Sequence, residues 1–124
     1  MTSAPAFKGG GNVALKLPER HYSDTLAFYR DTLGMPVLDE RPDGAVIDFG
    51  PIRLHLDRVA HQSQPDLWLE VRAEDSGAAK DYLAAHGTTV CPEVEALPEG
   101  FDGFWVAAPA GTIHLINAEG GLDG

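Results

Sequence analysis

The stretch VALKLPERHYSDTLAFYRDTLGMPV, residues 13–37, contains two different hydrophobic periods in succession. Over residues 12–18 every second side chain is apolar, which predicts a half-buried strand. Over residues 23–34 the apolar side chains recur at helical spacing, with Ser23 or Asp24 as the expected N-cap and a glycine at the end. The stretch therefore predicts a strand that is followed by a helix.

The same order of elements occurs twice along the chain. Three short strands are expected after the first helix, at residues 36–41, 45–50 and 52–58. After a polar linker, the second set comprises a strand at 66–73, a helix at 75–87 capped by Asp75 or Ser76, and strands at 88–96, 103–108 and 112–118. Neither half can bury its helix and sheet alone. We therefore expect an α+β fold in one domain spanning residues 1–124, built from βαβββ modules at 11–58 and 66–118.

Composition excludes several classes of protein. The chain has 9 Lys and Arg against 19 Asp and Glu, a formal net charge of −10, and this charge argues against a nucleic-acid partner. No apolar run approaches the length of roughly 18 residues that a membrane span needs. The single cysteine, Cys91, cannot form an internal disulfide or a Cys-based zinc site. These features, with a start that does not read as a signal peptide, predict a cytoplasmic protein without nucleic-acid or membrane partners.

Two motifs are similar to those of a known superfamily. The segment FYRDTLGM, residues 28–35, and the segment VAAPAGTIHLIN, residues 106–117, resemble the signatures of the vicinal-oxygen-chelate superfamily, which includes glyoxalase I, extradiol dioxygenases and bleomycin-resistance proteins. The resemblance covers residues 11–118. It implies paired βαβββ modules that form a curled mixed sheet around a concave cavity, and assembly as a homodimer.

The alternation along the strands also predicts which side chains face away from the helices. If the apolar alternates pack beneath the helices, the other alternates face the cavity. The expected inner set is Asn12, Ala14, Lys16, Arg53, His55, Asp57, Asp66, Trp68, Glu70, Arg72, Thr112 and His114. Within this set, His55 and His114 lie in the last strand of each module, and Asn12 and Asp66 open the first strands. We therefore expect His114 to be the counterpart of His55.

The resemblance implies that metal ligands occupy these four paired positions. They are Asn12, His55, Asp66 and His114 in this sequence, and two imidazoles with a carboxylate suit a divalent ion such as Fe, Mn, Ni, Co or Zn. Glyoxalase I chemistry needs a carboxylate base, and the glutamate expected there is absent, so this activity is not implied. No catalytic residue is assigned. The alternative is a metal-free pocket in which the four polar side chains bond to one another.

Five further inner residues are candidates for substrate binding. Lys16, Arg53 and Arg72 would hold a carboxylate or phosphate of the substrate, or else form ion pairs with Glu70, Asp57 or another acid. Trp68 would form a wall of the cavity, and Glu70 belongs to the same face.

Two functions follow from these observations. The first is a small divalent-metal-dependent enzyme, a lyase, isomerase, epoxide-opening enzyme or dioxygenase, that acts on a small organic substrate. The second is a metal-free protein of the bleomycin-resistance type that sequesters a drug. The negative charge would suit a cationic drug, and Trp68, Trp105 and Phe104 would stack on its rings.

Overall fold

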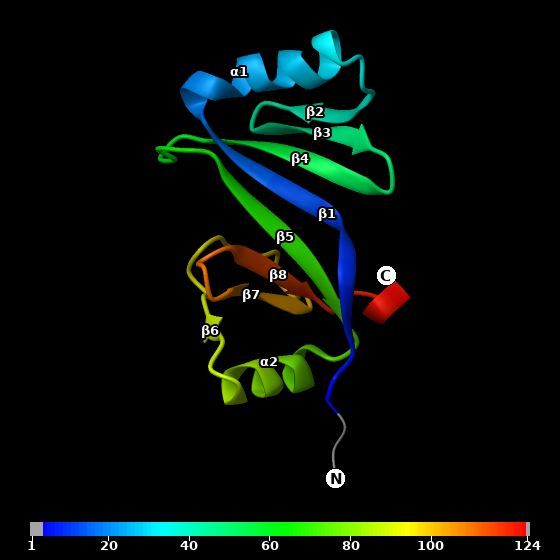
Figure 1. Cartoon of the computed structure of the whole chain (residues 1–124), viewed down its shortest axis with the longest axis vertical. Coiled ribbons are helices and arrows are strands. Elements are labelled where there is room, and N and C mark those ends of the chain that lie inside the picture. The colour runs from blue at the N-terminus through cyan, green and yellow to red at the C-terminus, as the bar shows by residue number, and fades with distance from the viewer. Residues whose placement is uncertain (1–3, 124) are drawn as a thin grey trace. The chain divides into compact units, whose positions relative to one another are not determined.

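The computed structural model describes residues 4–123, and Figure 1 shows the whole chain as a ribbon. Its elements occur in the order that the sequence predicts, βαβββ twice, so the α+β class and the paired modules are confirmed. The elements are β1 (Phe7–Pro18), α1 (Glu19–Ala27), a π-helical turn η1 (Phe28–Thr32), β2 (Val37–Arg41), β3 (Gly44–Phe49), β4 (Ile52–Val59), β5 (Asp66–Ala73), α2 (Ser76–Ala85), β6 (Thr89–Val90), β7 (Gly103–Ala107), β8 (Ile113–Asn117) and a 3-10 turn η2 (Gly121–Asp123).

The chain divides into two compact units that do not coincide with its two halves. The first unit comprises residues 11–68. The second comprises residues 69–123 together with the described residues before Gly11. The start of β1, including Phe7, therefore belongs with the second unit, and the start of β5 belongs with the first. That the two modules form one domain stays a prediction.

In the first unit, α1 packs on one face of a mixed sheet with the strand order β2-β3-β4-β1. Strands β1 and β4 are parallel, whereas β2, β3 and β4 pair antiparallel. The core between helix and sheet contains Tyr22 and Leu26 of α1, Ile47 of β3, and Leu54 and Leu56 of β4. Leu56 and Ile47 are fully buried. The helix and the apolar alternates of the strands thus cover one face, and the opposite face receives the polar alternates.

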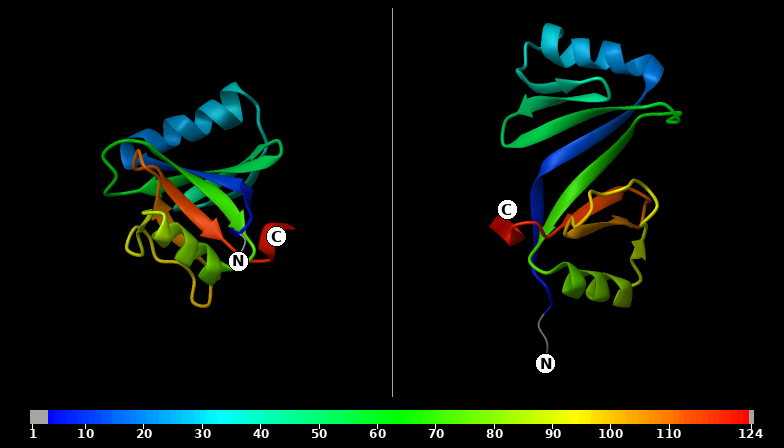
Figure 2. Two further views of the ribbon diagram at one scale, coloured as in Figure 1. Left: turned by 60° about the horizontal axis from the view of Figure 1, so that its bottom comes forward. Right: turned by 180° about the vertical axis from the view of Figure 1, so that it is seen from behind.

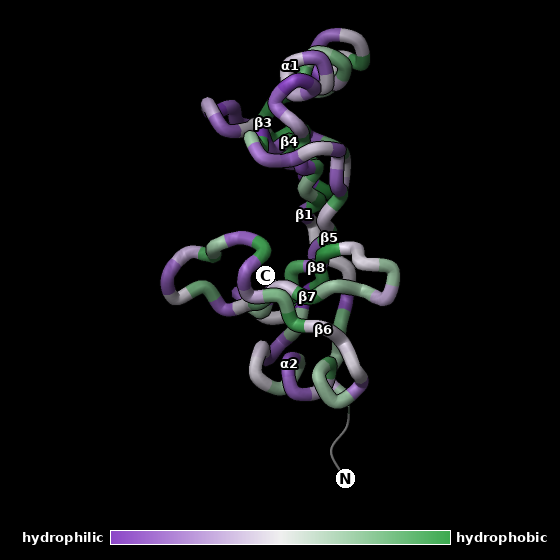
Figure 3. The backbone as a smooth tube through the Cα atoms, turned by 90° about the vertical axis from the view of Figure 1, so that its left-hand side faces the viewer, coloured by the Kyte–Doolittle hydropathy of each residue, from purple (hydrophilic) through white to green (hydrophobic). Residues whose placement is uncertain are grey.

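The second unit repeats this arrangement with α2 and the strand order β5-β8-β7-β6. Figure 2 shows this unit from two further sides, with α2 in yellow-green. Strands β5 and β8 are parallel, and β8, β7 and β6 pair antiparallel. Ala79 of α2 packs with Phe104, Val106 and Ile116 of the sheet, and Phe7 packs against this cluster. The hydrophobic residues, green in Figure 3, concentrate on strands such as β3 and β7.

Several element boundaries differ from the prediction. Strand β1 begins at Phe7 rather than at residue 12, and α1 ends at Ala27, where a π-helical turn continues to Thr32. Helix α1 begins at Glu19 rather than after Ser23 or Asp24, because Pro18, with φ −57°, forms its N-cap and leads directly into the first turn. The strand expected at 88–96 is limited to Thr89–Val90, since Pro92 cannot donate to a ladder. In contrast, Asp75 caps α2 as predicted, with its side chain accepting from a backbone amide. Between residues 4 and 123, no helix is long and apolar enough to cross a membrane.

One glycine opens the third strand of each module at the same structural position. Gly44 starts β3 and Gly103 starts β7. A Cβ atom at either position would lie 2.6 Å from a carbonyl oxygen of the next strand, that of Leu56 in the first unit and that of Ile116 in the second. Both positions therefore require glycine because the neighbouring backbone lies too close for a side chain.

Candidate functional site

In the first unit, a set of polar side chains lies on the sheet face opposite α1. The parallel register aligns Asn12 with Arg53, Ala14 with His55 and Lys16 with Asp57. The intervening residues Val13, Leu15 and Leu17 of β1 and Leu54 and Leu56 of β4 pack in the core beneath the helix. The predicted inner alternates of these two strands are thus confirmed. Arg53 is exposed near the start of β4.

Asn12 and His55 contact each other on this face. His55 Nε2 lies 2.9 Å from Asn12 Oδ1, and both side chains are partly buried. The amide oxygen of Asn12 is an acceptor, so this contact requires the proton of a neutral His55 to be on Nε2. The pair arises because Asn12 precedes by two residues the position that aligns with His55, which places both side chains on one face. Two of the four expected ligands are therefore adjacent.

Beside this pair, Lys16 is buried against an acid and an aromatic ring. Lys16 is 4% exposed, and its Nζ lies 2.6 Å from Asp57 Oδ2. The same Nζ lies 4.2 Å from the centre of the Trp68 ring. The Trp68 indole in turn donates a hydrogen bond of 2.9 Å to Asp66 Oδ2. Lys16 is therefore charge-compensated by Asp57 and by the electron-rich ring, and the Asp66 carboxylate accepts from Trp68.

In the second unit, Glu70 and Arg72 form a buried network with a residue that the sequence analysis did not single out. Asn117 donates a 2.9 Å hydrogen bond to Glu70 Oε2, and Arg72 Nη1 lies 4.0 Å from the same oxygen. Arg72 also donates to the backbone carbonyls of Glu119 and Gly121. Glu70 thus binds a side chain of β8, and Arg72 holds the segment that follows β8. The alignment of Arg72 with Asn117 between parallel strands is the signal that identifies Asn117.

His114 does not share the face of Glu70 and Arg72, so this part of the prediction is wrong. His114 aligns with Val106 of β7 and precedes Ile116 by two residues, and both of these residues belong to the core beneath α2. Because directly paired residues and alternate residues share a face, His114 lies on the helix side of its sheet. Its Nδ1 lies 3.0 Å from the Thr112 carbonyl oxygen.

The offset between the modules explains this difference. His55 aligns with Ala14, two residues after Asn12, whereas His114 aligns with Leu69, three residues after Asp66. A shift of one residue moves a side chain to the other face of a sheet. His114 is therefore not the structural counterpart of His55.

The donor groups of the expected metal site do not assemble within either unit. Among residues 4–123, no group of three or more His, Cys, Asp or Glu side chains is arranged to hold a metal ion. His55 contacts an amide, Asp66 accepts from an indole, and His114 lies on a helix-covered face. Most divalent transition-metal sites use three or more such ligands. The residues as placed do not fit a divalent ion, and the four-ligand site stays a prediction.

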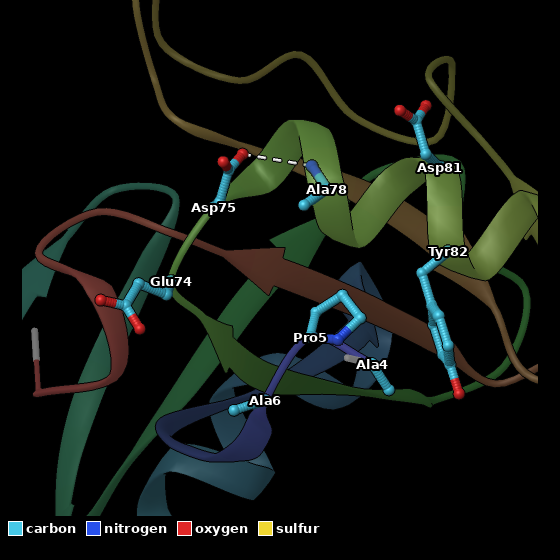
Figure 4. Close-up of a pocket in the computed structure, with 8 residues that line it drawn as sticks. All are labelled: Ala4, Pro5, Ala6, Glu74, Asp75, Ala78, Asp81 and Tyr82. Atoms are coloured by element: carbon cyan, nitrogen blue, oxygen red, sulfur yellow. Dashed lines mark hydrogen bonds between the residues drawn. The ribbon is translucent and has the colours of Figure 1, made fainter. Parts of the chain in front are cut away.

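A cavity of about 810 Å³ lies in the second unit, away from these residues. Helix α2, the end of β5 and residues 4–6 line it, and none of the predicted site residues is among the lining residues. Figure 4 shows that the Asp75 carboxylate turns back to the amide of Ala78 and that the Asp81 carboxylate points away from Pro5. Two of the three acids that line this cavity are thus turned away from it.

Comparison with known proteins gives matches at the level of structure. No protein-family model and no curated protein sequence matches the chain. Homoprotocatechuate 2,3-dioxygenase from Brevibacterium fuscum, in complex with 3,4-dihydroxyphenylacetate, has a TM-score of 0.65 at 21% identity over 92% of this chain and 37% of its own. Methylmalonyl-CoA epimerase from Mycobacterium tuberculosis has a TM-score of 0.61 at 16% identity over 94% and 91%.

A third similar structure is the Mn(II)-bound glyoxalase from Novosphingobium aromaticivorans, with a TM-score of 0.58 at 23% identity over 86% of this chain and 37% of its own. The chain thus spans little more than a third of the dioxygenase and of the glyoxalase, and nearly the whole epimerase. All three are members of the vicinal-oxygen-chelate fold. The chain has the vicinal-oxygen-chelate fold.

Proposed function

We propose that this protein binds a small organic molecule on the polar sheet face of its first unit, without a resident metal ion. The observation that supports this most directly is the set of polar side chains on that face, which comprises Asn12, Lys16, His55, Asp57 and Trp68. Burial of a lysine beside a partly exposed acid does not stabilise a fold more than apolar packing of similar volume does. A preorganised polar surface of this kind is better explained by recognition of a ligand.

The groups on this face define the chemistry of the ligand. His55 and Asn12 offer hydrogen-bonding groups that match hydroxyl or carbonyl oxygens, and Trp68 offers an aromatic surface. Because Asp57 compensates the charge of Lys16, the face does not select strongly for an anion. The net charge of −10 further favours a neutral or cationic molecule. We therefore propose an aromatic, oxygen-bearing ligand that is neutral or cationic, as the drug-sequestering members of the superfamily would bind.

The placement of the expected ligands supports a binding protein rather than a metalloenzyme. A metal site at the four positions needs His114 on the polar face of its sheet, but it lies on the helix side. It also needs the Asp66 carboxylate, which accepts a hydrogen bond from Trp68. No chemical step is therefore assigned to these residues, and their role in the proposal is to orient a bound molecule.

A titration with and without chelator tests this proposal. The chain carries two tryptophans, and replacement of Trp105 by Phe leaves the fluorescence of Trp68 as the reporter. Metal-free bleomycin, a cationic aromatic glycopeptide, is the first compound to test. We expect saturable quenching of Trp68 that EDTA does not change, and retention of less than about 0.1 metal ion per chain after dialysis against Co(II) and buffer.

Two outcomes would contradict the proposal. Retention of about one Co(II) per chain, lost in His55→Ala and in His114→Ala alike, would favour the metalloenzyme that the sequence predicts. Unchanged Trp68 fluorescence across bleomycin and a panel of catechols and aromatic amines would exclude a ligand on this face. A Trp68→Phe variant with Trp105 intact is the matched control, because Trp105 lies in the second unit and its indole donates to the Glu95 carbonyl.

A further inference from the structure

A second cavity, of about 240 Å³, lies in the first unit on the helix side of the sheet. We call it the arginine cavity. Its lining residues come from α1, η1, the end of β2 and the end of β4, and they are Tyr22, Ser23, Leu26, Arg30, Glu40, Arg41, Pro42 and Arg58. Because Tyr22 and Leu26 belong to the core beneath α1, this cavity and the face that carries His55 lie on opposite sides of the sheet. The volume is below the roughly 300–1,000 Å³ of sites for drug-sized ligands, so it suits a small ion or group.

Three guanidinium groups gather at the arginine cavity, and acids accompany each of them. Three of the nine Lys and Arg residues of the chain, Arg30, Arg41 and Arg58, line it. Each has an acid near its Nε atom, at 2.9 Å for Asp31, 3.3 Å for Asp39 and 3.4 Å for Glu19. A guanidinium has five N–H donors in a fixed fork, so one such neighbour does not exhaust it.

The only buried side-chain polar atoms without a hydrogen-bond partner in residues 4–123 both belong to this cavity. They are the hydroxyl of Tyr22 and Nε of Arg58, and the latter still has an ion-pair partner, Glu19 Oε2 at 3.4 Å. Tyr22 is 3% exposed, and the Arg58 guanidinium lies 4.3 Å from the centre of its ring. Buried polar groups in folded proteins nearly always have a partner, and an exception indicates a bound water, ion or ligand. The buried Tyr22 hydroxyl is such an exception, because it has no acceptor within residues 4–123.

The ionisation state of Tyr22 agrees with this reading. Burial raises the pKa of the Tyr22 phenol, Arg58 lowers it to a smaller extent, and Glu40, Asp43 and Asp57 raise it further. The phenol therefore keeps its proton at neutral pH and is a hydrogen-bond donor.

We propose that the arginine cavity binds a phosphate group, with the guanidinium groups of Arg41 and Arg58 and the hydroxyl of Tyr22 as donors. These two guanidinium groups and the phenol can all donate to the ligand, and a phosphate supplies acceptor oxygens with the charge and geometry that guanidinium forks match. Glu40 is an acid in the lining and lies 3.7 Å from Arg30 Nη1, so it opposes binding. The phosphate is either the free ion or the terminal group of a small phosphate monoester.

Calorimetric titration of the full chain with inorganic phosphate, at constant ionic strength, tests the proposal. We expect saturable binding of about one ion per chain against a chloride baseline, although the net charge of −10 repels anions in general. A parallel titration with glycerol phosphate distinguishes the two sources. Tighter binding of the ester than of the free ion identifies a phosphate monoester, and equal or weaker binding identifies the ion.

Matched variants distinguish specific phosphate binding in the cavity from long-range electrostatic attraction. Arg41→Gln removes a positive charge from the cavity. Arg20→Gln is the control: it also removes one positive charge, but Arg20 does not line the cavity and donates to the Ser63 carbonyl. We expect the first to weaken phosphate binding about fivefold or more and the second less than about twofold. Tyr22→Phe should weaken binding about tenfold, and Glu40→Gln should strengthen it.

The proposal is overturned if phosphate gives no signal beyond that of chloride. It is also overturned if Arg20→Gln and Arg41→Gln weaken binding equally, because the effect would then be long-range charge alone. Since Arg41 and Glu40 are exposed, their replacement leaves the core intact, and near-UV circular dichroism of each variant verifies the fold. The test does not involve His55 or Trp68, so its outcome is independent of the proposed function.

Discussion

Replacement of Gly44 by alanine should destabilise the first unit strongly. The added Cβ would lie 2.6 Å from the Leu56 carbonyl oxygen, about 0.8 Å short of the 3.4 Å at which ordinary contact begins. Leu56 is fully buried in the core, so its backbone cannot withdraw without moving β4. A displacement of this size would lengthen the donor–acceptor distance of a hydrogen bond between the strands from about 2.9 Å to more than about 3.5 Å. At that distance the hydrogen bond is lost.

Overpacking costs about 1–3 kcal/mol and a lost hydrogen bond about 1 kcal/mol. We therefore expect Gly44→Ala to lower the free energy of unfolding by about 3 kcal/mol, and Tm by roughly 10 °C for a chain of this length. Urea denaturation followed by circular dichroism gives both the midpoint and the slope. Gly103→Ala should behave alike, since its Cβ would meet the Ile116 carbonyl oxygen at the same distance.

Gly9→Ala is the matched control, because Gly9 is also a strand glycine but nothing lies within 4 Å of its added Cβ. We expect its stability to stay within about 0.5 kcal/mol of the parent or to rise slightly. Equal stability of the Gly9, Gly44 and Gly103 variants would refute the steric reasoning and would mean that the strand edges yield easily.

Further predictions concern the polar face, the caps and pH. His55→Ala should weaken binding of a ligand on the polar face about tenfold, whereas His114→Ala should leave the affinity unchanged in the same fluorescence titration. Asp75→Ala should remove the N-cap of α2 and cost about 1 kcal/mol in urea denaturation. Burial raises the pKa of Tyr22 above its ordinary value of 10.0, against the smaller effect of Arg58. The unfolded phenol therefore ionises first, and stability should fall as pH rises above 10. Tyr22→Phe should abolish that part of the decline, measured as Tm between pH 9 and 11.

The order of elements could be read from the sequence because each element has a clear period and a clear end. In β1 the apolar residues Val13, Leu15 and Leu17 alternate with smaller or polar ones. The pattern therefore assigns each side chain of this strand to one face of the sheet. The same alternation in β4 placed His55 on the polar face correctly. The N-cap of α2 was equally predictable, because Asp75 is a strong capping residue at a strand-to-helix junction.

The face of His114 could not be read in the same way. Strand β8 has apolar residues at both parities, Ile113 and Leu115 on one and Ile116 on the other, so the sequence pattern allows either face. The choice is made by contacts with Phe104 and Val106 of β7, which are distant in sequence. The arginine cavity could not be predicted from the sequence either, because its lining residues, from α1 and the ends of β2 and β4, come together only through tertiary packing.

The division of β1 between the two units determines which fragments of the protein can fold. Because Phe7 packs in the core of the second unit while residues 11–18 belong to the first, cleavage in the linker at 59–65 yields two pieces that each lack part of their own sheet. A piece beginning at Asp66 would lack the strand start that covers its core. Each piece should therefore fold only when the two are refolded together, and a half-length protein would require residues 4–10 to be grafted onto the second half.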